Sequence, residues 1–162
     1  MYMSEKEFQK LIEEKPYLVK NEPSKNKKPK NKYKNIKVYE YSDGFVSASN
    51  FKDEHGAIIN TYDSVKEYNR WNQLKLLEKA GEITELERQK SLLIQEAFTY
   101  NTRKINKINY IADFVYKKDG ILFVEDVKPF DEEKKKYRLT KDFQLKWKLL
   151  KYRYPDYQFI LF

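Results

Sequence analysis

The sequence predicts an α/β protein in which a central mixed β-sheet is flanked by helices. Two segments with helical spacing of apolar residues, at 64–80 and 140–153, alternate with strand-like segments. A last strand-like run at 157–162 follows the second helix. This order of strand, helix, strands, helix and strand predicts helices packed around a small mixed sheet.

The first 35 residues predict a short helix and a basic extension outside the folded body. Ser4 and Glu7 form a capping box at the start of residues 4–15. Residues 20–37 then carry eight lysines, one acid and few apolar side chains, which is typical of a segment that is disordered when free. We therefore expect the folded domain at 36–162.

The first elements of this domain are a hairpin and a helix. The turn residues Asp43-Gly44 predict a hairpin over 36–48, and residues 49–60 read as irregular. The helix at 64–80 begins at Asp63 or Ser64 and stops at Gly81. The remaining elements, in chain order, are β-like residues at 83–100, a polar turn at 101–104, strands at 108–116 and 121–128 around Asp119-Gly120, a charged loop at 129–139, a helix at 140–153 with Phe143, Trp147 and Leu150 on one stripe, and the strand at 157–162.

Composition excludes several classes of protein. The chain has no cysteine and a single histidine, His55, which excludes disulfide frameworks, thiol catalysis, cysteine-based zinc sites and paired-histidine metal sites. No apolar run approaches the ~20 residues that a membrane-spanning helix needs. No apolar stretch of the signal-peptide type follows Met1, so we expect a cytoplasmic protein without a membrane partner.

The net charge of +8 is concentrated in two basic islands. Residues 20–37 carry +7 and residues 134–153 carry +8, which leaves −7 on the rest of the chain. Two basic islands on an acidic body predict a polyanionic partner such as nucleic acid. The alternative is a solvated surface of a lysine-rich protein.

The predicted hairpin at 108–128 places two aspartates close together. If Asp119-Gly120 form a two-residue loop, Asp113 lies directly opposite Asp126, with the Cβ atoms about 5 Å apart; a four-residue loop would make them diagonal neighbours. By strand alternation, Asp113 shares its face with Ile111 and Val115, and Asp126 shares its face with Leu122, Val124 and Lys128.

Two opposed carboxylates on an apolar face repel each other unless a cation lies between them. Oxygen ligands without histidine or cysteine suit Mg²⁺ or Mn²⁺. Glu125 points to the other face, so it is either a surface residue or a support for the site. The competing interpretation is an Asp126–Lys128 ion pair at a strand end.

The tripeptide (Asp/Glu)-x-Lys alone is uninformative, because it begins at four positions: Glu13, Asp126, Glu132 and Glu133. Only the copy at Asp126 lies in a predicted strand that faces a second acid. This context, rather than the tripeptide, is what indicates chemistry.

Six motifs then carry a resemblance to a known family. They are Lys32-Tyr33-Lys34-Asn35, Asp63-Ser64-Val65-Lys66-Glu67, Leu76-Leu77-Glu78-Lys79-Ala80-Gly81-Glu82-Ile83, Tyr110-Ile111-Ala112-Asp113-Phe114, Val124-Glu125-Asp126-Val127-Lys128 and Thr140-Lys141-Asp142-Phe143. The hairpin pair resembles the catalytic hairpin of the PD-(D/E)XK nuclease superfamily. The whole set, over about 33–150, resembles a small phage-encoded family assigned to that superfamily. The chain departs from these patterns at Ala112, at Pro129 and in an apparent insertion at 43–60.

This resemblance implies a restriction-endonuclease-like core with a catalytic set of Glu67, Asp113, Asp126 and Lys128. It implies one or two Mg²⁺ (or Mn²⁺) ions held by Asp113, Asp126, Glu67 and the Val127 carbonyl. For Glu67, the residues alone also fit a capping box with Ser64. Its place on the helix face of Trp71 and Leu74 points it toward the core.

The implied activity is Mg²⁺-dependent endonuclease cleavage of DNA in the host cytoplasm. One version is a phage resolvase of Holliday junctions or branched DNA, which would act as a homodimer. Others are a nicking or transposon-end nuclease, which Tyr110–Pro129 also resembles, or a non-catalytic DNA-binding or inhibitor protein of the same fold. The candidate DNA contacts are Lys27, Lys28, Lys30, Lys32 and Lys34 of the arm and Lys141, Gln144 and Lys146 of the second helix, with Gln89 at the rim. The alternative for the helix residues is a solvated basic face.

Overall fold

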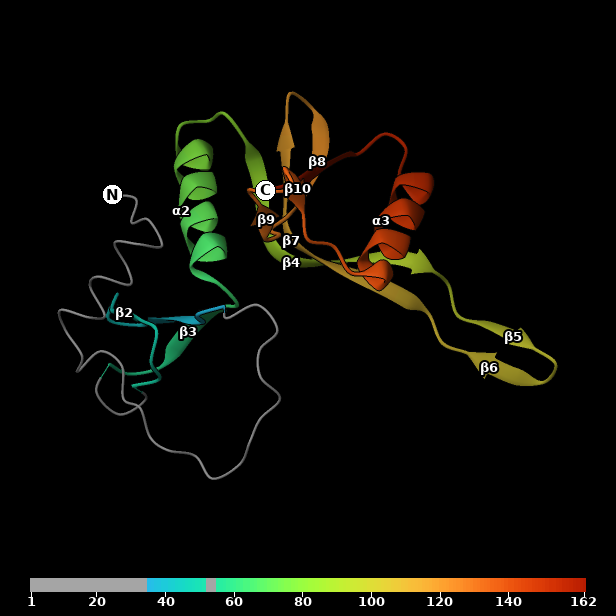
Figure 1. Cartoon of the computed structure of the whole chain (residues 1–162), viewed down its shortest axis with the longest axis horizontal. Coiled ribbons are helices and arrows are strands. Elements are labelled where there is room, and N and C mark those ends of the chain that lie inside the picture. The colour runs from blue at the N-terminus through green and yellow to red at the C-terminus, as the bar shows by residue number, and fades with distance from the viewer. Residues whose placement is uncertain (1–34, 52–54) are drawn as a thin grey trace. The chain divides into compact units, whose positions relative to one another are not determined.

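The computed structural model describes residues 35–51 and 55–162, which form two units divided between Asn72 and Gln73 (Figure 1). The helix predicted at 4–15 and the arm lysines Lys27, Lys28, Lys30, Lys32 and Lys34 lie outside the described residues.

The first unit contains a three-stranded antiparallel sheet in the order β2-β1-β3. Its strands are β1 (Val38–Tyr41), β2 (Val46–Ser47) and β3 (Ile58–Tyr62). The predicted hairpin is confirmed, since β1 and β2 pair around a turn in which the Phe45 amide donates to Asp43 Oδ1 (2.9 Å). The prediction that 49–60 is wholly irregular is wrong, because β3 pairs with β1. The strand was not predicted because the polar residues between Ile59 and Tyr62 interrupt the alternation of apolar residues that is typical of a strand.

Helix α2 (Val65–Lys79) follows β3 and agrees closely with the predicted helix. Val65 packs with Val38 and Tyr62 in a small core, which explains why the helix begins immediately after the strand. The helix stops at Gly81, as predicted, because Gly81 adopts a positive φ of 78°. The Gly81 amide then donates to the Glu78 carbonyl at 3.0 Å.

The second unit is built on a four-stranded mixed sheet in the order β11-β8-β7-β4. Its strands are β4 (Thr84–Gln95), β7 (Ile108–Lys118), β8 (Ile121–Asp126) and β11 (Gln158–Leu161). Strand β11 is parallel to β8, whereas the β7–β8 and β4–β7 pairs are antiparallel. The predicted α/β class and mixed sheet are therefore confirmed.

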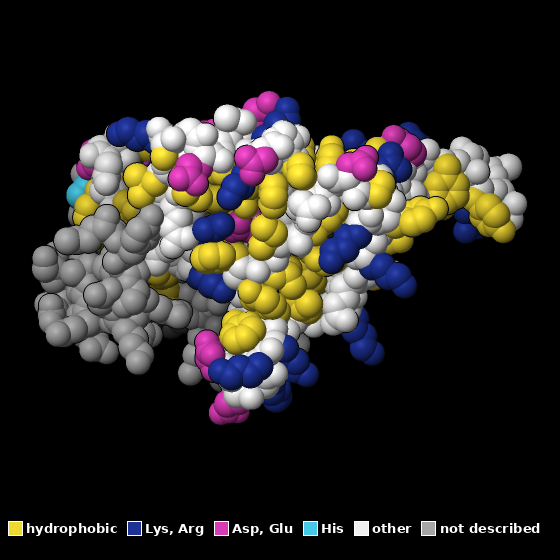
Figure 2. Space-filling view, turned by 90° about the horizontal axis from the view of Figure 1, so that it is seen from above, with side chains coloured by type: hydrophobic (Ala, Val, Ile, Leu, Met, Phe, Trp, Pro, Cys, Tyr) yellow, Lys and Arg dark blue, Asp and Glu magenta, His cyan; other side chains and the backbone are white. Residues whose placement is uncertain are grey.

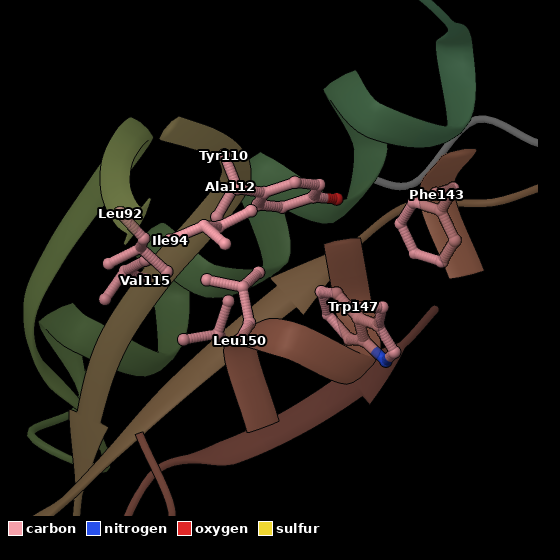
Figure 3. Packing of buried hydrophobic residues seen from close by; sticks show 9 residues of the cluster. Leu92, Ile94, Tyr110, Ala112, Val115, Phe143, Trp147 and Leu150 are labelled. Atoms are coloured by element: carbon pink, nitrogen blue, oxygen red, sulfur yellow. The ribbon is translucent and has the colours of Figure 1, made fainter. Parts of the chain in front are cut away.

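Helix α3 (Lys141–Arg153) packs on one face of this sheet. Thr140 caps it by accepting a hydrogen bond from the Phe143 amide (3.2 Å). The predicted stripe of Phe143, Trp147 and Leu150 is buried against β4, β7 and β8 (Figure 3). The other members of this core are Leu92, Ile94, Tyr110, Ala112, Val115 and Val124.

Two short antiparallel ribbons complete the second unit. One is β5 (Phe98–Tyr100) with β6 (Arg103–Ile105), and the other is β9 (Phe130–Asp131) with β10 (Lys136–Tyr137). The second ribbon corrects the prediction of a plain loop at 129–139. It closes because Asp131 accepts from the Lys134 amide (3.1 Å) and pairs with Arg138. The Lys134 amide, with the Arg138 charge, holds the pKa of Asp131 below its usual range.

Among the described residues, no helix combines the length and the apolar character that crossing a membrane requires.

We predict that Leu150→Ala lowers the free energy of unfolding by about 2–5 kcal/mol, because Leu150 is fully buried beneath the sheet. The matched control on the same helix is Leu145→Ala, whose side chain is 58% exposed and which should change stability by less than about 0.5 kcal/mol. Urea denaturation followed by tryptophan fluorescence measures both. Equal effects of the two substitutions would contradict this packing.

Candidate active site on the β7–β8 hairpin

The register of the β7–β8 hairpin agrees with the predicted two-residue turn. Lys118 pairs with Ile121 and Phe114 pairs with Glu125, the last recorded pair. Asp119 and Gly120 both have positive φ (51° and 78°), as a tight hairpin turn of this type requires. Strand β8 ends at Asp126, one residue beyond this pair, where the same register would place Asp113 opposite Asp126.

The side of strand β7 that faces the core changes near Asp113. Ala112 and Val115 are three residues apart, yet both belong to the core beneath α3. Ile111 is 62% exposed, so the face that Asp113 was expected to share with Ile111 is not buried at Ile111. In β4, Gln89 lies between the partners of Ala112 and Phe114 and has a positive φ of 48°, although the register of β4 with β7 is continuous there.

Asp113 is half-buried and reaches over the end of β8. Its Oδ2 accepts a hydrogen bond from the Val127 amide at 2.7 Å. Val127 is the residue between Asp126 and Lys128, so this bond ties the first aspartate to the segment that carries the other two predicted residues. The structure thus brings Asp113, Asp126 and Lys128 together around one peptide.

Asp126 is almost fully buried, and both of its oxygens have specific neighbours. Oδ1 accepts a hydrogen bond from the Tyr110 hydroxyl, and Oδ2 forms an ion pair with the Lys128 ammonium. The Lys128 Nζ also lies 3.4 Å from the Val127 carbonyl oxygen and 4.5 Å from the centre of the Phe143 ring. The ammonium is therefore held between oxygen ligands on one side and an aromatic face on the other.

Tyr110 is a site residue that the sequence reasoning did not single out. It is buried in the α3 core, with its hydroxyl directed away from the aliphatic side chains (Figure 3). Burial raises the pKa of the Tyr110 hydroxyl above its usual value, and the nearby negative charge of Asp113 acts in the same direction. The hydroxyl therefore keeps its proton and remains a donor to Asp126. The sequence does show a tyrosine three residues before Asp113. Its proximity to Asp126 could be predicted only with knowledge of the change of face in β7.

The oxygen atoms around Val127 suit a hard cation. Two carboxylates and one carbonyl are gathered there, and the ammonium of Lys128 already contacts two of these three groups. Within residues 35–51 and 55–162, no group of three or more acidic or histidine side chains is arranged as a metal site. Mg²⁺ fits such a sparse set, because it is usually bound by one or two carboxylates and keeps several waters.

The two remaining acidic residues have local roles. In the first unit, Glu67 is buried, its amide donates to Ser64 Oγ (3.1 Å) and its Oε2 accepts from the Asp63 amide (3.0 Å). These contacts confirm the capping interpretation, and the metal-site role remains a prediction. Glu125 is fully buried and accepts a hydrogen bond from the Tyr116 hydroxyl (3.2 Å), which excludes the surface alternative, whereas a supporting role at the site remains a prediction.

The predicted DNA contacts on α3 lie at its start and along its exposed side. Lys141 is exposed, the Gln144 amide donates to the Leu139 carbonyl (3.2 Å), and Lys146 forms an ion pair with Asp142 (3.0 Å). A cavity of about 950 Å³, lined in part by Lys134, Arg138 and Gln144, opens between the β9–β10 ribbon and this helix start. Gln89 is exposed on β4.

We predict that Tyr110→Phe lowers the free energy of unfolding by about 1–3 kcal/mol, because it leaves a buried carboxylate oxygen without its donor. The control is Tyr100→Phe, whose hydroxyl belongs to a 65% exposed side chain and should be neutral. Chemical denaturation of both variants gives the comparison. A neutral Tyr110→Phe would show that Asp126 does not depend on this hydroxyl.

Comparison with known proteins gives a family but no activity. The family described as "Protein of unknown function (DUF1064)" matches residues 55–161. No curated protein and no solved structure matches the chain. The matched residues include α2, the β7–β8 hairpin and α3, and they make up well over half of the 162 residues. The chain therefore belongs to the DUF1064 family.

Proposed function

We propose that this protein is a metal-dependent endonuclease that hydrolyses phosphodiester bonds in DNA. The observation that carries the proposal is the convergence of Asp113, Asp126 and Lys128 on the Val127 peptide. Two carboxylates beside a lysine are the charged groups that metal-assisted hydrolysis of a phosphodiester uses. The resemblance of this hairpin to PD-(D/E)XK nucleases supports the same reaction.

Each residue of the hairpin has a distinct task in this proposal. Asp113, Asp126 and the Val127 carbonyl would hold Mg²⁺ or Mn²⁺, which supplies charge neutralisation at the scissile phosphate. Tyr110 keeps Asp126 oriented. Lys128 leaves its ion pair with Asp126 and orients the attacking water, whose oxygen bonds to phosphorus as the bond to the leaving sugar oxygen breaks.

The closed Asp126–Lys128 ion pair favours one alternative. In a DNA-binding or inhibitor protein without catalysis, the same pair would simply compensate a buried charge. The two functions are separated by incubating the chain with Mg²⁺ and linear, supercoiled or four-way-junction DNA. Binding without cleavage selects the alternative, and cleavage confined to the junction selects a resolvase over a nicking or transposon-end nuclease.

We predict that Asp113→Asn and Lys128→Met each reduce Mg²⁺-dependent cleavage by at least about 100-fold, because each removes a charged group from the reacting centre. Asp113→Asn retains an oxygen that can accept from the Val127 amide, so the fold should persist. The matched controls are Asp119→Asn and Lys118→Met, which are exposed positions in the same hairpin. These should cleave at the wild-type rate.

The measurement is the initial rate of nicking of supercoiled DNA, with circular dichroism to verify folding. Wild-type cleavage by a folded Asp113→Asn variant would reject the proposed site. A contaminating nuclease would be revealed by cleavage that is unchanged in all four variants.

We predict that Glu67→Gln separates the two roles of Glu67. Glutamine also serves in a capping box, so the free energy of unfolding should change by less than about 0.5 kcal/mol. If Glu67 contributes to the metal site, cleavage should fall at least 10-fold. Ser64→Ala is the control: it removes the hydrogen bond to the Glu67 amide, should cost about 1 kcal/mol of stability and should leave cleavage intact. Unchanged cleavage by Glu67→Gln would reject the metal-site role of Glu67 and leave helix capping as its role.

A further inference from the structure

The β5–β6 ribbon extends beyond the four-stranded sheet as a continuation of β4 and β7 (Figure 1). Phe98 pairs with Ile105 and Tyr100 pairs with Arg103, across a turn at Asn101-Thr102. All six strand residues of the ribbon are exposed. Neither β5 nor β6 pairs with any other strand in the described part of the chain.

One face of this ribbon is apolar and aromatic. Phe98 and Tyr100 are 47% and 65% exposed, and Ile105, opposite Phe98, is also exposed. Cross-strand partners and alternate residues share a face, so these three side chains lie together. Figure 2 shows apolar side chains on this projecting end of the molecule. A thin ribbon is marginally stable in water, so a contiguous apolar face on it indicates a surface that receives a partner.

The charge of the ribbon identifies the chemistry of that partner. Residues 97–112 contain no acid and three cations, Arg103, Lys104 and Lys107. None of these cations forms an ion pair with an acidic side chain of the described residues. Arg103 lies on the aromatic face opposite Tyr100, and Lys104 lies on the other face opposite Thr99. Aromatic side chains interleaved with unpaired cations are the arrangement that binds nucleic-acid strands.

We propose that the β5–β6 ribbon binds unpaired nucleotides of a DNA strand. Bases stack on Phe98 and Tyr100, and Arg103, Lys104 and Lys107 contact the flanking phosphates. Unpaired nucleotides are the ligand because stacking on a protein ring requires a base face that is not covered by its neighbours in a duplex. A second copy of the chain is a poorer partner, because two ribbons that each carry Arg103 and Lys104 and no acid would repel each other. This inference rests on the proposed function for the identity of DNA as the substrate.

The test uses the full chain without divalent metal, so that binding is measured apart from cleavage. The aromatic variant is Phe98→Ala/Tyr100→Ala, and the basic variant is Arg103→Ala/Lys104→Ala. The matched control is Leu76→Ala/Lys79→Ala, an exposed apolar and basic pair on α2. The probes are a fluorescent single strand, the corresponding duplex and a four-way junction with unpaired nucleotides at its centre, measured by anisotropy over a range of salt concentrations.

The aromatic variant should lose at least 10-fold in affinity for the single strand and the junction, and less than about 3-fold for the duplex, since stacking is lost. The basic variant should bind all three probes more weakly and lower the slope of log K against log salt by about 1.4 on the single strand, because two phosphate contacts are removed. The control should bind like the wild type.

Three results would overturn the inference. One is single-strand affinity of the aromatic variant equal to that of the control. Another is an equal loss on duplex and single strand. The third is a wild-type dimer, seen by sedimentation, that the aromatic variant breaks without any loss of DNA affinity. If the ribbon variants lose binding but the wild type never cleaves DNA, the proposed nuclease activity is rejected and the ribbon inference is supported. If the wild type cleaves DNA and neither binding nor cleavage changes in the ribbon variants, the ribbon inference is rejected and the nuclease activity is supported.

Discussion

The burial of the Asp126 carboxylate at the end of β8 is the constraint on which the rest of the second unit depends. A buried charge is strongly unfavourable unless it is paired and hydrogen-bonded. Tyr110 supplies the hydrogen bond from β7, and Lys128 supplies the opposite charge from the residue pair that follows β8. Lys128 in turn lies over Phe143 of α3. One carboxylate thus links two strands, the segment after them and the helix that covers them.

This compensation explains the irregularity of β7. A regular strand that buried Val115 beneath α3 would direct Tyr110 to the opposite face. The change of face between Ala112 and Val115 places Tyr110 and Val115 in the same core. Gln89 of the adjacent strand, between the partners of Ala112 and Phe114, has a positive φ. Within this change of face, Asp113 accepts a hydrogen bond from the Val127 amide.

Local patterns in the sequence were sufficient for much of this arrangement. The Asp119-Gly120 turn predicted the hairpin register, and the spacing of Phe143, Trp147 and Leu150 predicted the buried stripe of α3. The role of Tyr110 and the burial of Glu125 were not predictable, because both depend on which face of a twisted, distorted sheet is covered. Strands β3, β6, β9 and β10 were missed for a related reason: they are short and form through pairing with a partner rather than through their own apolar alternation. For β6, the predicted polar turn at 101–104 is therefore wrong at Arg103 and Lys104, which lie in the strand.

The ribbon is connected to the strand that carries the candidate site by a very short segment. Strand β7 carries Asp113, and only Asn106 and Lys107 separate it from β6. Ile105 and Asp113 are eight positions apart, which an extended chain spans in roughly 26 Å. Because the connection is so short, a strand held by the ribbon would be held at a restricted distance from Asp113. In the proposed function, the ribbon would then select the substrate by the position of its unpaired nucleotides relative to the scissile phosphate.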